Sequence, residues 1–177
     1  MTKRFVFTLA GSDKIGIVDR VTQIIVQYAG NVESSKMARL GGEFAMLVMV
    51  ACPSDQYDSL HTKLTGLQDD GFQVIFRQTD DVQDQSYKGW LPYKITVHGA
   101  DHEGIVHNIT HILSKNNINI ETMDTQIIHA PMSGTPLFSM VAIVLVPPEV
   151  TFKSWRDSLD ILSIESNFAI DIAPYTG

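Results

Sequence analysis

The sequence predicts an α+β protein made of two copies of one βαββαβ unit, each an antiparallel sheet with its helices on one face. The first observation is a repeat: residues 5–33 match residues 93–121 without a gap, and ten of these 29 positions are identical. The second is that both copies continue with the same succession of strand and helix patterns. Because a polar stretch without either pattern separates the copies, we expect a domain at 1–80, a linker at 81–91 and a second domain at 92–177.

Each element of the first copy has its own pattern. Short runs rich in β-branched and aromatic residues predict strands, and apolar residues at helical spacing predict helices with one face against a sheet. Gly41 and Gly42 suit the positive φ angles of a tight hairpin turn. We expect strands at 4–10, 31–40, 43–52 and 71–78, and helices at 16–28 and 57–70.

The second copy is six residues longer than the first, because matching positions are 88 residues apart up to Glu33 and Glu121 and 94 residues apart from Phe44 and Phe138 onward. The extra residues fall in 129–136, where two prolines and a glycine predict a loop between two strands. In the first copy, residues 44–52 are apolar at odd and even positions, which predicts a strand buried on both sides. Since each exposed large apolar side chain forfeits roughly 1.5–3 kcal/mol, we expect the second copy, or a second chain in a homodimer, to cover the open sheet face.

Charge and composition narrow the classes of partner. The formal net charge is −7, and the halves divided after residue 85 carry −3 and −4. Such a field repels phosphate backbones, so we expect no direct contact with nucleic acid. The longest apolar run, 44–52, has about half the length that a membrane-spanning helix needs, so we expect neither a membrane partner nor an anchor. The single cysteine, Cys52, forms no internal disulfide, which fits a cytoplasmic location.

Both first loops share a motif, GxDxxG followed by Ile-Val. Its residues are Gly11, Asp13, Gly16, Ile17 and Val18 in the first copy and Gly99, Asp101, Gly104, Ile105 and Val106 in the second. Together with Asn31 and Asn119, which open the second strands, and with the βαββαβ order, this motif resembles a tandem pair of ACT domains. Among tandem ACT proteins without a catalytic domain, the chain is most similar to the glycine cleavage system transcriptional repressor family.

The resemblance implies a ferredoxin-like fold and a regulatory protein that is not an enzyme. It implies that these twelve residues bind a small ligand, an amino acid such as glycine, where paired domains meet. It also implies control of transcription or metabolism through a protein partner, a transcription activator, with no cofactor.

The loop residues themselves allow two interpretations of the aspartates. A helix that begins near Gly16 or Gly104 presents unpaired amides that favour a ligand carboxylate, and Asp13 or Asp101 then lies close enough for the ligand's ammonium group. Alternatively, each aspartate is an ordinary N-cap that accepts a bond from a first-turn amide. The glycines are structural under both interpretations.

Two rival functions have weaker support. His107 and His111 lie one helical turn apart in a histidine-rich stretch, but the apolar stripe directs both toward solvent and the first copy has Asp19 and Gln23 there. We therefore predict no metal site, and a metal-sensing ACT protein stays an alternative beside an interaction module without a ligand. No nucleophile elbow, phosphate loop, HExxH or CxxC motif indicates an enzyme.

Overall fold

The computed structural model describes residues 1–79, 87–129 and 134–176. The chain divides into two compact units, Met1–Gln83 and Asp84–Gly177. Residues 81–86 of the predicted linker and residues 130–133 of the predicted second-copy loop lie outside the described residues.

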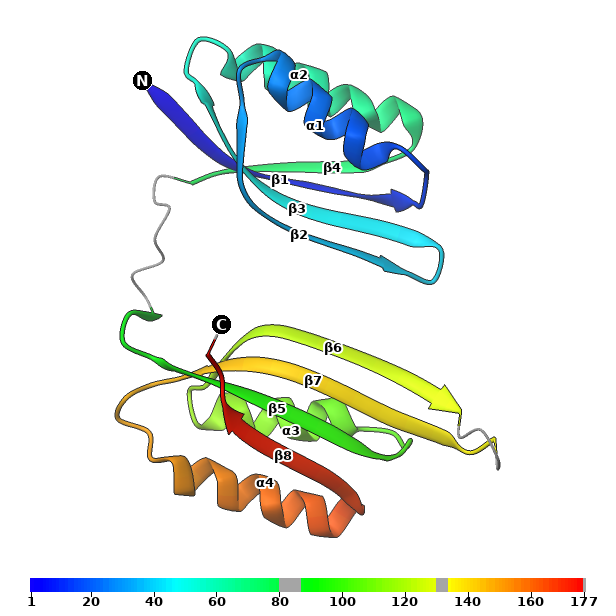
Figure 1. The fold of residues 1–177 in the computed structure, drawn as a ribbon, viewed down its shortest axis with the longest axis vertical. Coiled ribbons are helices and arrows are strands. Elements are labelled where there is room, and N and C mark those ends of the chain that lie inside the picture. The colour runs from blue at the N-terminus through cyan, green and yellow to red at the C-terminus, as the bar shows by residue number, and fades with distance from the viewer. Residues whose placement is uncertain (80–86, 130–133, 177) are drawn as a thin grey trace. The chain divides into compact units, whose positions relative to one another are not determined.

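The first unit is one antiparallel sheet with two helices on one of its faces (Figure 1). The strand order across the sheet is β2-β3-β1-β4. Its elements are β1 (Thr2–Ser12), α1 (Ile17–Gln27), β2 (Asn31–Leu40), β3 (Glu43–Pro53), α2 (Tyr57–Thr65), the 3₁₀ helix η1 (Gly66–Asp70) and β4 (Gln73–Gln78). The predicted helix at 57–70 thus consists of an α-helix and a 3₁₀ turn, which ends at Gly71 with φ of 90°.

The second unit repeats this arrangement, with the strand order β6-β7-β5-β8 and both helices on one face of the sheet (Figure 1). Its elements are β5 (Leu91–Ala100), α3 (Ile105–Lys115), β6 (Asn119–His129), β7 (Pro136–Val146), α4 (Phe152–Ser166) and β8 (Phe168–Pro174). The predicted α+β class with two ferredoxin-like units is confirmed. Among the described helices, none combines the length and the apolar character required to cross a bilayer.

Each unit has its own hydrophobic core between its helices and the inner face of its sheet. The predicted apolar stripe of α1 is buried there, because its members recur every three or four residues and face the sheet together. In the second unit, Trp155 of α4 and Met140 of β7 are both fully buried in the equivalent core. The loops at the ends of these elements are therefore joined to strands and helices that pack in a core.

Within the first unit alone, residues 44–52 are buried on one side only, and the expected cover of the other side by the second copy or a second chain stays a prediction. Met46 and Val48 are 1% exposed, whereas Leu47 between them is 48% exposed. Successive side chains of a strand point to opposite faces, and the helices of this unit cover only one of them. Leu47 of β3 and Ile75 of β4 lie on either side of Thr8 of β1, and Ile75 is likewise exposed. The helix-free face of the first sheet is therefore apolar and open within its unit.

Candidate functional site

The first helix of each unit begins at a glycine in the left-handed conformation. Gly16 has φ 90° and ψ −1°, and Gly104 has φ 87° and ψ −3°. A side chain at either position would be strained, which accounts for the last glycine of each GxDxxG motif. Neither helix receives a side-chain hydrogen bond at its N-cap. In the described chain, the amides of Val18 and Asp19 consequently have no protein acceptor.

The interpretation of the motif aspartates as N-caps is wrong for both units. Glycine occupies each N-cap, and no side chain bonds to it. Asp13 instead contacts the hairpin: its Oδ2 lies 2.8 Å from Nε of Arg39 on β2, and its backbone amide donates to the carbonyl oxygen of Gly42 at 2.9 Å. The loop before α1 is thereby fastened to the β2–β3 hairpin.

The second unit keeps the backbone contact but lacks the ion pair. The amide of Asp101 donates to the carbonyl oxygen of Pro136 at 3.1 Å. The position that matches Arg39 in the repeat is Ile127, which is 55% exposed. Within the ranges that the structure describes, no basic side chain pairs with the carboxylate of Asp101. The two loops thus share a backbone path and differ in local charge.

The first glycine of each motif is explained by packing. A Cβ on Gly11 would lie 2.7 Å from Cδ1 of Phe72, and a Cβ on Gly99 would lie 2.4 Å from Cβ of Phe168. These phenylalanines lie at corresponding positions beside the last strand of each unit. A loop side chain lies over each ring: Lys14 Nζ is 5.0 Å from the Phe72 centroid, and His102 stacks on Phe168 at 6.1 Å between centroids.

Loop contacts with the chain before β4 complete this end of the first unit. Lys14 Nζ donates to the carbonyl oxygen of Asp70 at 2.8 Å. The carboxylate of Asp70 also accepts from Nη2 of Arg20 on α1 at 2.7 Å. The loop, the start of α1 and the end of η1 are therefore held together.

The structure does not bring all twelve predicted site residues together. Ile17 and Ile105 are buried in the cores, whereas Val18 is half-buried and Val106 is 37% exposed. On β3, Asn31 lies opposite Ala51 and Gly11 lies opposite Phe44, which is seven positions away. The partners of Asn119 and Gly99 on β7 are also seven positions apart. At about 3.3 Å per residue, each asparagine is roughly 23 Å from its glycine loop.

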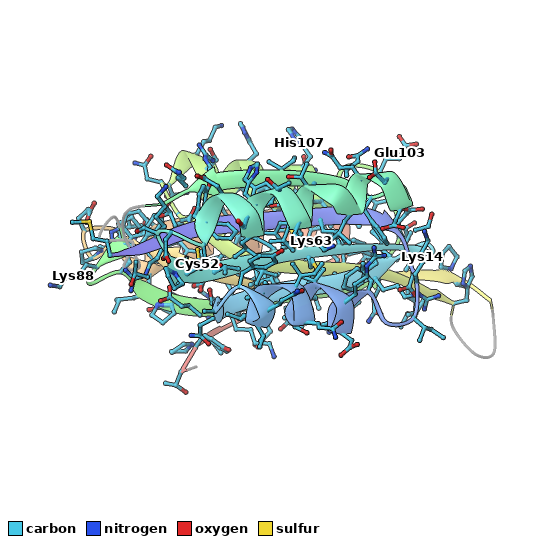
Figure 2. All side chains as sticks on the ribbon, turned by 90° about the horizontal axis from the view of Figure 1, so that it is seen from above. Lys14, Cys52, Lys63, Lys88, Glu103 and His107 are labelled. Carbon is cyan, nitrogen blue, oxygen red and sulfur yellow. The ribbon has the colours of Figure 1, made fainter. Side chains whose placement is uncertain are left out.

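Figure 2 shows the same separation in the first unit. The labelled Lys14 lies at the loop end, and the labelled Cys52, next to Ala51, lies toward the other. One small ligand therefore cannot contact a loop and the asparagine of the same unit.

Sequence reasoning missed a cleft of about 650 Å³ at the loop end of the first unit. Three alanines line it, Ala10, Ala38 and Ala45, which are neighbours in register across β1, β2 and β3. Glu43 and Ser12 are also among its lining residues, and the Ser12 hydroxyl lies 3.4 Å from Oε1 of Glu43. Its remaining lining residues are Gly11, Leu40, Phe44, Gly71 and Gln73. The small side chains hollow the helix-free face of the sheet beside the motif loop.

The described residues form no preformed metal cage, and the pKa of one of their side chains is clearly shifted. No group of three or more His, Cys, Asp or Glu side chains converges as metal ligands in the ranges that the structure covers. Burial raises the pKa of the Cys52 thiol above its ordinary value of 9.0, and the nearby Lys3 partly opposes this effect. Cys52 lies at the end of the sheet remote from the motif loop, so it plays no part in this site.

Comparisons with known proteins agree with this architecture. The sequence model of the family described as ACT domain matches residues 3–76. A crystal structure of a Galdieria sulphuraria protein of unknown function is 32% identical, covers 99% of this chain and 100% of its own, and has a TM-score of 0.84. A protein provisionally assigned as a glycine cleavage system transcriptional repressor is 18% identical, covers 99% of both chains and has a TM-score of 0.67, which shows a shared fold.

Curated relatives match a shorter segment. The UPF0237 proteins of Methanosarcina mazei and Methanosarcina acetivorans are each 32% identical over 57 residues. That segment is 32% of this chain and 62% of each relative, so the match spans less than two thirds of their length.

Proposed function

Because the first unit of this chain is an ACT domain and the second repeats its fold, we propose that the protein is a non-enzymatic regulator that binds an amino acid such as glycine. The observation that supports this most is the start of α1 and α3, where uncapped amides follow a loop that contains Asp13 or Asp101. A ligand carboxylate would accept from these amides, a contact worth about 0.3–1 kcal/mol at an exposed terminus. The ligand's ammonium group would then lie near Asp101, or near Asp13, where it competes with the guanidinium group of Arg39.

In the first unit, the alanine-lined cleft gives such a ligand additional room. Gly11 and Ser12 belong both to the end of β1 and to the cleft lining. Glu43, which pairs with no basic side chain among the described residues, adds a second carboxylate on its rim. A positively charged group on an otherwise small or apolar ligand fits this combination.

We propose that the regulated output is transcription or metabolism, controlled through a protein partner such as a transcription activator. The fold shared with a provisionally assigned transcriptional repressor supports this output. The net charge of −7 disfavours direct binding to DNA, so a protein is the better candidate for the contact. Ile15 and Leu40, 108% and 81% exposed, lie in the motif loop and at the hairpin tip, where a partner can sense an occupied loop.

A second candidate function is an interaction module that binds a protein partner without any small ligand. The same exposed Ile15 and Leu40 favour it, because large apolar side chains at a loop end are typical of protein contacts. Under this alternative, the uncapped amides are hydrated by water and have no ligand.

The experiment that separates the two functions is a thermal-shift screen of the full chain against the common amino acids, followed by titration calorimetry on any that respond. Any ligand that prefers the native state raises the melting temperature, by an amount that grows with its concentration above Kd. We expect a small amino acid to respond and the motif loops to gain protection in hydrogen exchange. A flat screen with unchanged loop protection would favour the module without a ligand.

A further inference from the structure

We infer that His107 and His111 form a binding site for a divalent transition-metal ion on the outer surface of α3. The site lies in the second unit and does not depend on the proposed ligand or partner. It departs from the prediction of no metal site made from the sequence, because the structure places the two exposed rings side by side. Both side chains are exposed. Their position on a helix, one turn apart, places two nitrogen donors on the same face.

The two rings are stacked, and they lie close to the separation that a shared ion requires. The two imidazole centroids are 5.8 Å apart and the ring planes differ by 19°. With metal–nitrogen distances of about 2.1 Å and ring radii of about 1.1 Å, an ion that holds both rings at neighbouring positions, about 90–110° apart, places the centroids roughly 4.5–5.2 Å apart. Rotation of the exposed rings about their side-chain bonds is therefore enough to direct one nitrogen of each toward a common ion.

The helix holds this pair in place. Ile105, Ile109 and Leu113 of α3 are buried in the core of the second unit, with exposures of 2%, 0% and 0%. They fix the rotation of the helix, so the opposite face with His107 and His111 stays in solvent. The backbone does not have to be ordered when the ion binds, and this lowers the entropic cost of binding.

The donor chemistry selects the class of ion. Imidazole nitrogens suit zinc, copper and nickel, and among divalent ions of this series Cu²⁺ binds such sites most tightly. The described residues supply no third protein ligand, so water or a small solute takes the remaining positions. Once one imidazole has bound the ion, binding of the second imidazole is intramolecular. The pair should therefore bind the ion roughly a hundredfold more tightly than a single histidine does.

The first unit supplies an internal comparison. The positions of α1 that match this pair are Asp19 and Gln23, and α1 has the same length as α3 and also begins at a left-handed glycine. We expect α1 to bind no Cu²⁺ comparably. Installing Asp19→His together with Gln23→His should create a second equivalent site on the same scaffold.

The test is titration calorimetry of the full chain, without an affinity tag, with Cu²⁺ and with Zn²⁺, together with electron paramagnetic resonance of the Cu²⁺ complex. We expect one tight ion per chain and hyperfine coupling to two imidazole nitrogens. His107→Ala or His111→Ala should each weaken binding roughly a hundredfold. His98→Ala, an exposed histidine on β5, is the matched control and should change nothing.

Two outcomes would overturn the site. One is Cu²⁺ affinity in His107→Ala and His111→Ala equal to that of the unmodified chain, and the other is a spectrum that shows a single nitrogen donor in the unmodified protein. Circular dichroism of the variants confirms that α3 is intact, so that weaker binding is not mistaken for unfolding. The engineered pair on α1 gives a second, independent result, since it should add one bound ion per chain.

Discussion

Nε of Arg39 lies 2.8 Å from Oδ2 of Asp13, so a guanidinium group of the hairpin occupies the position in which a ligand's ammonium group would meet this carboxylate. The second unit has Ile127 at the matching position and leaves Asp101 without a basic partner among the described residues. Two loops with the same motif therefore present different charges to a ligand.

Arg39→Ala should strengthen binding of an amino acid at the first loop. The pair is largely exposed, so it is worth at most about 1 kcal/mol, and its removal should raise affinity no more than about fivefold. Titration calorimetry measures the affinity and urea unfolding measures stability, which should fall by less than about 1 kcal/mol. Arg77→Ala on β4 is the control. Weaker binding in Arg39→Ala would mean that Arg39 holds the ligand carboxylate instead.

Asp13→Asn and Asp101→Asn should each weaken amino-acid binding, because the neutral amide loses its attraction for an ammonium group. Asp101→Asn should keep its stability within about 0.5 kcal/mol, since Asp101 caps no helix. Asp13→Asn also loses the ion pair with Arg39 and should lose less than about 1 kcal/mol. Calorimetric titration of the full chain gives the affinities. Asp58→Asn on α2 and Asp157→Asn on α4 are matched controls in the two units. If both loop variants bind as tightly as the unmodified protein, the aspartates do not belong to the site.

Asn31→Ala and Asn119→Ala should leave amino-acid affinity unchanged. Each asparagine lies at the far end of its sheet, roughly 23 Å from the glycine loop of the same unit. The measurement is the same calorimetric titration, with Asp101→Asn as the positive control for loss. A loss of affinity in either asparagine variant would place the ligand away from the glycine loops.

Gly99→Ala should lower stability more than Gly11→Ala. The added methyl group at residue 99 would lie 2.9 Å from the backbone Cα of Phe168, whereas at residue 11 it meets the ring of Phe72, which can shift. Overpacking of this kind costs typically 1–3 kcal/mol. Gly66→Ala is the control, because it has open space and helical φ, and it should leave stability unchanged or raise it. Melting temperatures of the three variants give the order, and equal values for both motif glycines would contradict it.

The first unit should lose stability as pH rises above 9.0 because of Cys52. Burial raises the pKa of this thiol in the folded state, so the thiol ionises first in the unfolded chain. As pH rises past 9.0, this ionisation lowers the free energy of the unfolded state relative to the folded state. The contribution of the neutral thiol to the free energy of unfolding is complete below pH 9.0 and is lost as pH rises through the raised pKa. Urea unfolding across this range, compared with Cys52→Ala, isolates the thiol from other titrating groups. An identical pH dependence in both proteins would exclude the effect.

The fold could be predicted because its signals are local or repeated. Apolar spacing in α1 and the paired glycines at 41 and 42 each specify one element, and the duplicated motif specifies that the order recurs. The division of the predicted helix at 57–70 was missed, because an apolar stripe does not distinguish an α-helix from a 3₁₀ turn at its end.

The site was predicted less completely, because its features depend on register and on long-range pairing. Nothing near Asp13 in the sequence indicates that Arg39 pairs with it, since β2 must first fold beside the loop. The alanine-lined cleft likewise exists only once Ala10 and Ala38 both lie next to Ala45 across three strands. Leu47 is exposed on the sheet face without helices, and composition does not reveal what covers that face.

The left-handed glycines that start α1 and α3 have a consequence for how the two halves of the chain can diverge. Because the backbone of a glycine alone turns the chain into each helix, the side chains of residues 13 and 101 are not needed to start the helices. Their chemistry, and that of the neighbours they meet, can change while the architecture persists. One half of the duplicated protein can therefore specialise in recognition while the other becomes a purely architectural copy.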